Sequence, residues 1–212
     1  MNIGIIGAGN VGQALGKGLT NADHTVTISS RDPDSEKLQA WKREAGPKSR
    51  SGTFSEAAQF GELVIVALTW SSVEGVLKSI PSEYLANKIV IDVSNAIEFG
   101  NPLRLAVANT SMGELVQQWL PKSYVVKTLN MVDSSRFVHP EFEEGTPTMF
   151  VAGNDQSAKD QVRRLLEELG WKDIIDLGDI RQSRLQEALS LVCMTCQMQL
   201  QAFGAAFALL RK

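Results

Sequence analysis

Short runs of branched apolar residues alternate along this chain with segments whose apolar residues recur every three or four positions. Such runs predict buried strands, and the wider spacing predicts amphipathic helices that pack against them. The expected strands span residues 2–6, 25–29, 63–68, 88–93, 124–128, 148–152 and 173–176, and the expected helices span 10–20, 35–44, 53–60, 72–79, 111–119 and 156–169. Strands that are apolar throughout and alternate with helices predict an α/β fold of the Rossmann type, a doubly wound parallel sheet with helices on both faces.

The last part of the chain has a different pattern. After Ile180 no strand is expected, and apolar residues recur at helical intervals as far as Leu210, which predicts one long helix or two with a break near Gly204. So much apolar surface must be buried, part of it against a second subunit, which predicts a homodimer. We therefore expect a Rossmann domain at 1–179 and a C-terminal helical segment at 180–212, which forms a crevice wall and a dimer contact. Residues 46–52 are expected to form a mobile loop.

Composition narrows the class of protein. The chain has 212 residues, of which 43% are hydrophobic and 21% charged, and its net charge is -3, as is typical of a soluble globular protein. An acidic balance argues against nucleic acid and anionic membranes as partners, since both require a basic surface. No apolar run is long enough to span a bilayer. Two cysteines and the lack of a leader predict a cytoplasmic protein.

Three glycines follow the first expected strand at the spacing G-x-G-x-x-G. Gly7 permits a tight turn, Gly9 lets the backbone approach a pyrophosphate, and Gly12 lets helix and strand pack closely. The start of the following helix then offers free N–H groups to the phosphates, so Asn10 and Val11 join the expected contacts. This context predicts that the chain binds a dinucleotide.

The turn after the second expected strand indicates which dinucleotide. NAD enzymes generally place an acidic residue here for the ribose 2′-hydroxyl, but this chain has Ser30 and Arg31. A hydroxyl and a guanidinium suit a 2′-phosphate, which favours NADP(H) over NAD(H). The alternative is that Arg31 is a solvated turn residue and that Asp32 takes the acidic role.

Polar and aromatic residues follow the later strands, at the edge of the sheet where ligands bind. Leu68, Thr69 and Trp70 come after one strand, and Asn95 and Asn130 come after the next two. We expect Thr69 and Asn95 near the nicotinamide end of the cofactor, with Trp70 as a flat wall or as a packing residue of the next helix. Asn130 either orients a nicotinamide or substrate or serves only as a turn residue.

Other reactive residues do not form a recognisable site. His24 is expected to be structural, and His139 is a loop residue before a proline. Cys193 and Cys196 have CxxC spacing but lie in an apolar helix without a second ligand pair, which favours buried small residues over a zinc or redox site. Lys127 should point away from Thr128 and is not assigned as a general acid. We assign no catalytic residue and no metal ligand.

Five segments in order resemble the NADPH-dependent reductases of the deazaflavin coenzyme F420. They are IGIIGAGNVGQALGKGLT, HTVTISSRDP, VALTW, VVKTLNMV and DIRQSRLQEALS. The wider relatives include predicted dinucleotide-binding reductases and the cytosolic domain of the six-transmembrane epithelial antigen metalloreductases. The resemblance implies an NADP(H) domain, a homodimer and a flavin or deazaflavin that stacks over the nicotinamide. It also implies that Asn130, Met131 and Arg184 line the acceptor side.

Departures from this family leave the acceptor open. The cradle Gly-Ala-Gly-Asn is one residue shorter than the family's, and DVSNAI and KTLNMVDSS stand where its proline-bearing segments lie. The expected function is hydride transfer between NADP(H) and a flavin-like, deazaflavin or other small redox acceptor. Such a transfer depends on stacking and orientation more than on an acid or base. The alternatives are an imine or pyrroline-carboxylate reductase and a non-catalytic NADP(H)-binding redox sensor.

Overall fold

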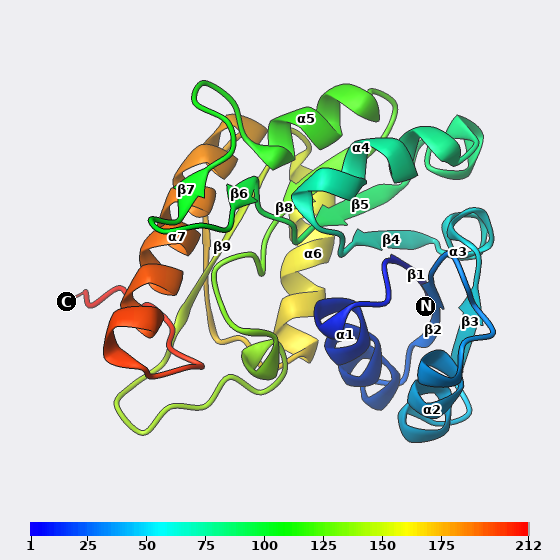
Figure 1. The fold of residues 1–212 in the computed structure, drawn as a ribbon, viewed down its shortest axis with the longest axis horizontal. Helices are drawn as coiled ribbons and strands as arrows, with labels where there is room; N and C mark the ends of the chain where they lie inside the picture. Colours follow the sequence, from blue (N-terminus) through cyan, green and yellow to red (C-terminus); the bar gives the residue numbers. More distant parts are fainter. Residues whose placement is uncertain (212) are drawn as a thin grey trace.

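The computed structural model describes residues 1–211 and has a central sheet of eight strands (Figure 1). In sheet order the strands are β3 (Ser49–Gly52), β2 (Thr25–Ser29), β1 (Asn2–Ile6), β4 (Leu63–Val66), β5 (Ile89–Asp92), β8 (Tyr124–Lys127), β9 (Thr148–Gly153) and β10 (Asp173–Asp176). The first six strands in this order are mutually parallel, and this confirms the Rossmann-type fold.

The sheet is mostly parallel, as expected, with one antiparallel pair at one side. β9 is antiparallel to β8, and β10 is parallel to β9. Residues 128–147, which connect β8 to β9, contain only a short 3-10 turn at Ser134–Arg136 and no helix that could carry the chain back across the sheet. A parallel neighbour needs such a crossover, so β9 starts from the edge where β8 ends and runs in the opposite direction.

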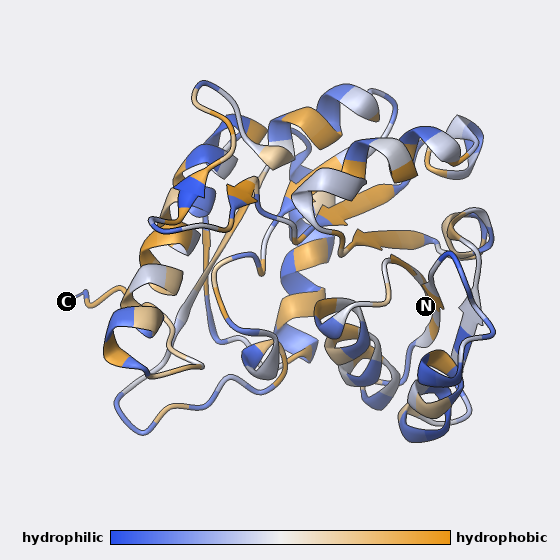
Figure 2. Ribbon diagram, in the orientation of Figure 1, coloured by the Kyte–Doolittle hydropathy of each residue, from blue (hydrophilic) through white to orange (hydrophobic). Residues whose placement is uncertain are grey.

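Helices cover both faces of the sheet because side chains alternate along each strand. One face is covered by α1 (Asn10–Asn21), α2 (Glu36–Ala45) and α6 (Gln156–Glu168), and the other by α3 (Phe54–Phe60), α4 (Trp70–Ser79) and α5 (Met112–Trp119). Ile5 of β1 thus belongs to the first apolar layer and Ile6 to the second. Figure 2 shows β4 and β5 in hydrophobic colours and α2 mostly in hydrophilic ones.

The C-terminal part is one helix and an irregular tail. A 3-10 turn at Ile180–Gln182 leads into α7 (Ser183–Leu200). The prediction that the helix continues beyond residue 200 is wrong, because Gln201 has a left-handed backbone with φ of 51°. Residues 201–211, which we call the tail, form hydrogen bonds with β9 instead. The Thr148 N–H donates to the Phe207 carbonyl at 2.9 Å, and the Leu209 N–H donates to Thr148 Oγ1 at 2.8 Å. The tail is therefore held at the start of β9.

Three short strands were not predicted from the sequence. β3 pairs with β2 as an edge strand, where a mobile loop was expected, and the polar letters SRSG explain why it was missed. β6 (Ile97–Glu98) and β7 (Arg104–Leu105) form a small antiparallel pair that is stabilised by an ion pair of 2.6 Å between Arg104 and Glu98. Within residues 1–211, no helix combines the length and the apolar character needed to cross a membrane.

Candidate functional site

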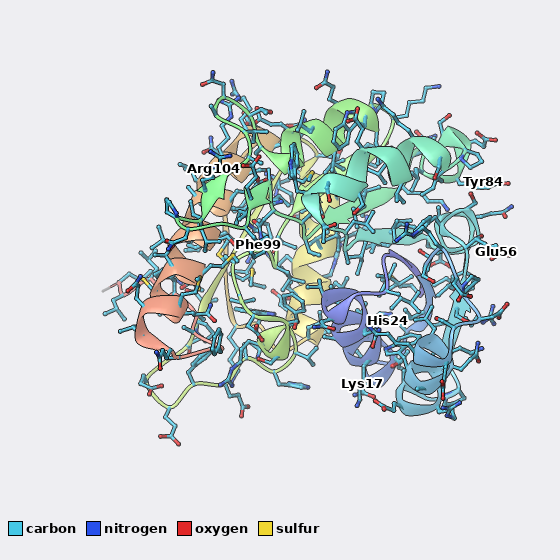
Figure 3. All side chains as sticks on the ribbon, viewed as in Figure 1. Lys17, His24, Glu56, Tyr84, Phe99 and Arg104 are labelled. Carbon is cyan, nitrogen blue, oxygen red and sulfur yellow. The ribbon has the colours of Figure 1, made fainter. Side chains whose placement is uncertain are left out.

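A crevice opens at the carboxyl edge of the sheet, where the strand order reverses. β1 has β2 on one side and β4 on the other, which makes this the switch point at which open α/β sheets bind ligands. A cavity of about 930 Å³ lies here and adjoins a second of about 480 Å³. Both are lined by Asn10, Val11, Val93, Asn95 and Phe99, so they are two parts of one crevice. After the roles that we propose for them below, we call the larger one the cofactor cavity and the smaller one the acceptor cavity. In Figure 3, Phe99 is labelled between α7 and α1.

The three glycines of the motif have different local requirements. Gly7 has φ of +119°, and a Cβ there would lie 2.2 Å from the Ala67 carbonyl oxygen; a Cβ on Gly12 would lie 2.1 Å from the Gly7 carbonyl oxygen. Both residues must therefore be glycine for the turn to form. Gly9 lines the cofactor cavity with an ordinary φ of -72°, and a Cβ there would meet nothing within 4 Å. The fold itself places no demand on Gly9.

Two helix N-termini reach this crevice without a capping side chain. α1 begins after Gly9, which has no side chain, and α4 begins after Thr69, whose side chain accepts no hydrogen bond from the helix backbone. Neither helix has an acidic residue in its first turn. By contrast, Thr53, Ser111 and Asp155 cap α3, α5 and α6 through their side chains. The free N–H groups and positive dipole ends of α1 and α4 are suited to bind anions.

The turn after β2 lies beside the glycine turn, because Ser29 pairs with Ile6 in the parallel register. The Ser30 N–H donates to the Gly52 carbonyl at 3.2 Å, and the Ser30 hydroxyl accepts from the Asp32 N–H at 3.1 Å. Arg31 is exposed, and within residues 1–211 its guanidinium forms no ion pair. Ser30 and Arg31 lie outside both cavities, on the rim next to the glycine turn.

Two asparagines join the strand ends at the base of the crevice. Asn95 Nδ2 donates to the Asn130 carbonyl at 2.7 Å, and Asn130 Nδ2 donates to Asn95 Oδ1 at 2.9 Å. Ser190 of α7 donates to the same Asn130 carbonyl at 2.9 Å. Asn130 Oδ1 is buried without a partner in the described part of the chain. The pair therefore fixes the loops after β5 and β8 and connects them to α7.

Most of the predicted site residues meet in this crevice. Those that line it are Gly9, Asn10, Val11, Leu68, Thr69, Trp70, Asn95, Asn130 and Met131. Sequence reasoning expected the C-terminal segment to form a crevice wall, but it did not identify the residues of α7 that line the crevice, which include Ser190, Cys193, Met194 and Gln197. These residues recur at helical spacing, and this is the signal that would have revealed a common face. Cys193 is buried, which raises the pKa of its thiol, whereas Cys196 is exposed, so the CxxC pair does not converge.

Arg184 does not reach the crevice. It lies in the first turn of α7, and its guanidinium binds the Glu114 carboxylate of α5 through two bonds of 2.7 and 2.6 Å. This pairing outweighs the effect of partial burial and holds the pKa of Glu114 below its usual range, and the Ser111 hydroxyl lowers it further by a smaller amount. Ser190 lies six residues further along α7, about 9 Å at 1.5 Å per residue. The part of α7 that lines the crevice therefore begins at Ser190.

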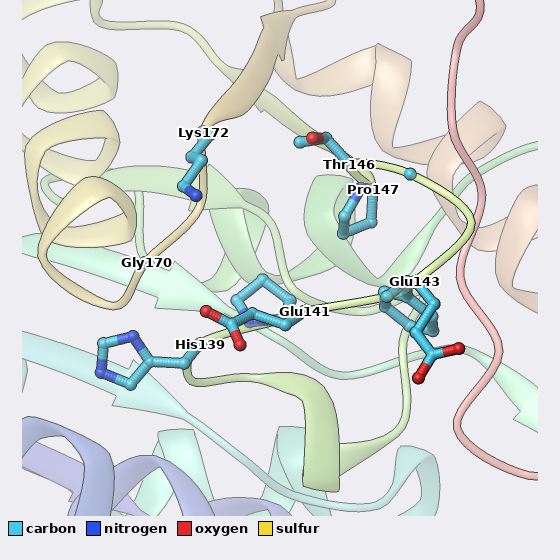
Figure 4. A pocket seen from close by; sticks show the side chains of 10 residues that line it. His139, Glu141, Glu143, Thr146, Pro147, Gly170 and Lys172 are labelled. Atoms are coloured by element: carbon cyan, nitrogen blue, oxygen red, sulfur yellow. The ribbon is translucent and has the colours of Figure 1, made fainter.

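A separate hollow of about 720 Å³ lies by the loop from His139 to Pro147 (Figure 4). No predicted cofactor or acceptor residue lines it. Figure 4 shows His139 and Glu143 at opposite ends of this hollow. Within residues 1–211, its titratable groups His139, Glu141, Glu143 and Lys172 form no ion pair with one another and no metal-binding cluster. His24, the other histidine, is buried and bonds Glu168 at 2.8 Å, as expected for a structural residue.

Imine reductases share the fold of this chain. An imine reductase from Streptomyces aurantiacus superposes with a TM-score of 0.67 at 20% identity, over 94% of this chain and 64% of that one. A pyrroline carboxylate reductase from Plasmodium falciparum gives a TM-score of 0.61 at 16% identity. At these identities the likeness shows the fold alone.

A different group of proteins matches the chain far more fully. Residues 2–96 match the family model of coenzyme F420-dependent NADP oxidoreductases. The F420-dependent NADP reductase of Methanocaldococcus jannaschii is 26% identical over 96% of each chain. The crystal structure of a candidate F420-dependent NADP reductase from Arthrobacter sp. FB24 is 35% identical over the whole of both chains, with a TM-score of 0.93. Full-length agreement in sequence and structure shows that this chain belongs to the family of coenzyme F420-dependent NADP oxidoreductases.

Proposed function

We propose that the crevice binds NADP(H) with the pyrophosphate against Gly9 and passes hydride between the nicotinamide and a deazaflavin or flavin. The observation that carries this proposal is the contrast among the three glycines. Gly7 and Gly12 are required by backbone contacts of 2.2 and 2.1 Å, but nothing in the fold requires Gly9. If residue 9 had a side chain, that side chain would occupy only the open space where a phosphate approaches the backbone.

The remaining parts of the cofactor have matching groups nearby. The unpaired guanidinium of Arg31 and the Ser30 hydroxyl are suited to the 2′-phosphate, so the chain should prefer NADP(H). The uncapped starts of α1 and α4 suit the pyrophosphate. Thr69 and Asn95 border the cavity where the nicotinamide end would lie. When bound, NADPH supplies the hydride, and these residues hold and orient it.

The acceptor cavity has the character of a site for a flat, mainly uncharged ring. Its wall includes three methionines and three phenylalanines, namely Met131, Met194, Met198, Phe99, Phe137 and Phe203. Thioethers and aromatic rings favour contact with a planar conjugated system. Asp133 is the single charged residue among the described residues that line this cavity. A deazaflavin or flavin ring therefore fits the acceptor side.

The chemistry needs no acid or base from the protein. Among the described residues that line the two cavities, none is lysine, arginine or histidine, and the only carboxylates are Glu98 and Asp133. Glu98 is paired with Arg104. Hydride transfer between two stacked rings depends on distance and orientation, which the crevice walls supply.

α7 also has a surface suited to a homodimer. Leu185 and Val192 are 60% and 50% exposed, and they lie seven residues apart on one face of the helix. Phe203, just beyond the helix, is 78% exposed. A second copy would bury this apolar surface. A cytoplasmic location would suit an enzyme with two free cysteines.

Acceptor tests distinguish an enzyme from a sensor. Purified protein with NADPH is given a deazaflavin, FMN, FAD or a ferric chelate singly, and NADPH oxidation is followed by absorbance. We expect the deazaflavin to be reduced fastest. Phe203→Ala should raise the acceptor KM and leave the Kd for NADPH unchanged, whereas Leu210→Ala, in the exposed tail, should change neither. Tight NADPH binding with no oxidation by any acceptor would support the redox sensor instead.

A further inference from the structure

A cluster of three ionisable side chains is buried next to the crevice. Lys127 Nζ lies 2.8 Å from Asp92 Oδ2 and 3.1 Å from Glu187 Oε1, and the three side chains are at most 2% exposed. Asp92 and Lys127 are the last residues of β5 and β8, and Glu187 belongs to α7. The proposed hydride transfer uses none of them.

Both carboxylates have a donor on each oxygen. Asp92 Oδ1 accepts from the Ser94 N–H at 2.9 Å, and its other oxygen accepts from the lysine ammonium. Glu187 Oε2 accepts from the Ala96 N–H at 3.2 Å, and its Oε1 faces the Gly113 N–H at 3.3 Å as well as the ammonium. A protonated carboxyl group carries an O–H donor of its own, and this O–H would face one of the N–H donors that already surround the carboxylate. The hydrogen bonding therefore favours ionised Asp92 and ionised Glu187.

The cluster then has a net charge of minus one. Burial disfavours the charged form of Lys127, but the attraction of Asp92 and then of Glu187 outweighs burial and raises its pKa. One ammonium and two carboxylates leave one negative charge without a counterion. β7 and α5 pack against α7. Arg104 of β7 is paired with Glu98, and Arg184 of α7 is paired with Glu114 of α5, so neither arginine supplies a free positive charge to the cluster.

This charge lies directly behind the crevice wall. Asp92 and Glu187 hold the backbone N–H groups of Ser94 and Ala96, the two residues on either side of Asn95. Ser94 and Asn95 line the cofactor cavity. A buried charge without a counterion acts strongly on a charge in the neighbouring cavity, because little water screens the interaction.

We propose that the Asp92–Lys127–Glu187 cluster sets the redox preference of the site by stabilising NADP⁺ relative to NADPH. This inference rests on the proposed function, because it requires the nicotinamide to lie beside Asn95. When NADPH is oxidised, a hydride leaves C4 of the ring with its electron pair, and the ring becomes positively charged. The deazaflavin or flavin takes the hydride, and a proton from solvent completes its reduction.

The direction and size of the effect follow from electrostatics. A negative charge near the ring favours the cationic oxidised form, so bound NADPH becomes a stronger hydride donor. For charges about 10 Å apart at an effective dielectric constant of about 20, the preference is roughly tenfold. A tenfold preference corresponds to a potential of the bound couple about 30 mV below that of the free couple. Asp92, Lys127 and Glu187 are thus positioning residues that act through their field.

The test uses the near-isosteric variants Asp92→Asn and Glu187→Gln, each of which removes one negative charge. The Kd values of NADP⁺ and NADPH are measured separately by calorimetry and by NADPH fluorescence. The ratio Kd(NADP⁺)/Kd(NADPH) should rise roughly tenfold in each variant. Glu74→Gln, which removes a carboxylate that is 53% exposed on α4, should leave the ratio unchanged.

Other outcomes have separate meanings. If both cofactors weaken equally, the cluster only holds the loops in place, and the proposal is overturned; an unchanged ratio with normal binding overturns it as well. If wild-type protein binds neither cofactor, the proposed function fails. Should both variants fail to fold, the wild-type potential decides: about 30 mV below the free couple supports the proposal, and a value at or above it refutes the proposal.

Discussion

Replacement of Gly9 by alanine tests whether this glycine is required for folding or for cofactor binding. Gly9 has φ of -72° and ψ of -177°, which alanine adopts without strain, and the new Cβ would meet no atom within 4 Å. The free energy of unfolding should therefore not fall, and it should rise by about 0.4–1 kcal/mol because alanine restricts the unfolded chain. Thermal unfolding without ligand measures this.

The same methyl group should weaken dinucleotide binding. It occupies the space through which a phosphate approaches the N–H groups at the start of α1, so at least one such hydrogen bond is lost. A hydrogen bond to a charged group contributes about 1.5–3 kcal/mol, which corresponds to a roughly 10- to 150-fold higher Kd. Titration of NADPH by fluorescence tests this. Unchanged affinity in a stable Gly9→Ala protein would refute the placement of the pyrophosphate.

Two other glycines serve as controls. Gly75 is exposed in the middle of α4, and a Cβ there would also meet nothing within 4 Å. Gly75→Ala should stabilise the helix by about 0.5–1 kcal/mol and leave NADPH binding unchanged. Gly12→Ala should instead destabilise the protein by about 1–3 kcal/mol or more, since its Cβ would lie 2.1 Å from a backbone oxygen.

Three further substitutions test the rim, the α5–α7 contact and the dimer. Arg31→Ala should weaken the binding of NADPH by about 2 kcal/mol more than the binding of NADH. Replacement of the exposed Arg43 by alanine should have no such effect. Equal losses of affinity for both cofactors would exclude a contact between Arg31 and the 2′-phosphate. Glu114→Gln should cost about 0.5–1 kcal/mol of stability at pH 7. Because the folded-state pKa of Glu114 is lowered, this loss of stability should be complete above about pH 5 and should disappear as the pH falls through that pKa. Denaturant unfolding at pH 7 and pH 3.5 measures the difference in unfolding free energy between wild type and variant. An equal difference at the two pH values would contradict this expectation. Val192→Asp should convert a dimer to monomers in analytical ultracentrifugation, while Leu210→Asp should not, and a wild-type monomer would rule out the dimer.

Much of the fold was predictable because most strands of the sheet are short apolar or β-branched runs, and the central ones are buried on both faces. The predicted bounds 2–6, 25–29 and 173–176 agree with β1, β2 and β10, since each is an apolar or β-branched run between polar residues. β3 was missed because an edge strand of sequence SRSG has no apolar pattern. The direction of β9 was missed because the pattern of one strand does not report how its neighbour runs.

The site was predictable where it depends on strand ends and turns. Gly9, Thr69 and Asn95 follow strands whose order is characteristic of the fold, and all three line the cofactor cavity. Contacts between distant segments were not predictable. Arg184 binds Glu114 across 70 residues of sequence, and Lys127 lies between two carboxylates that only tertiary structure brings together.

The division of the crevice between early and late segments of the chain has a consequence for how its specificity can change. The cofactor cavity is formed almost entirely by residues 9–99, whereas the acceptor cavity draws on 129–137, α7 and Phe203. The tail that follows Phe203 is anchored separately at Thr148. Substitutions at residues that line the acceptor cavity alone, such as Met131, Phe137, Met198 and Phe203, should therefore select a new acceptor while the nucleotide site stays intact, so the two halves of the reaction can evolve at different rates.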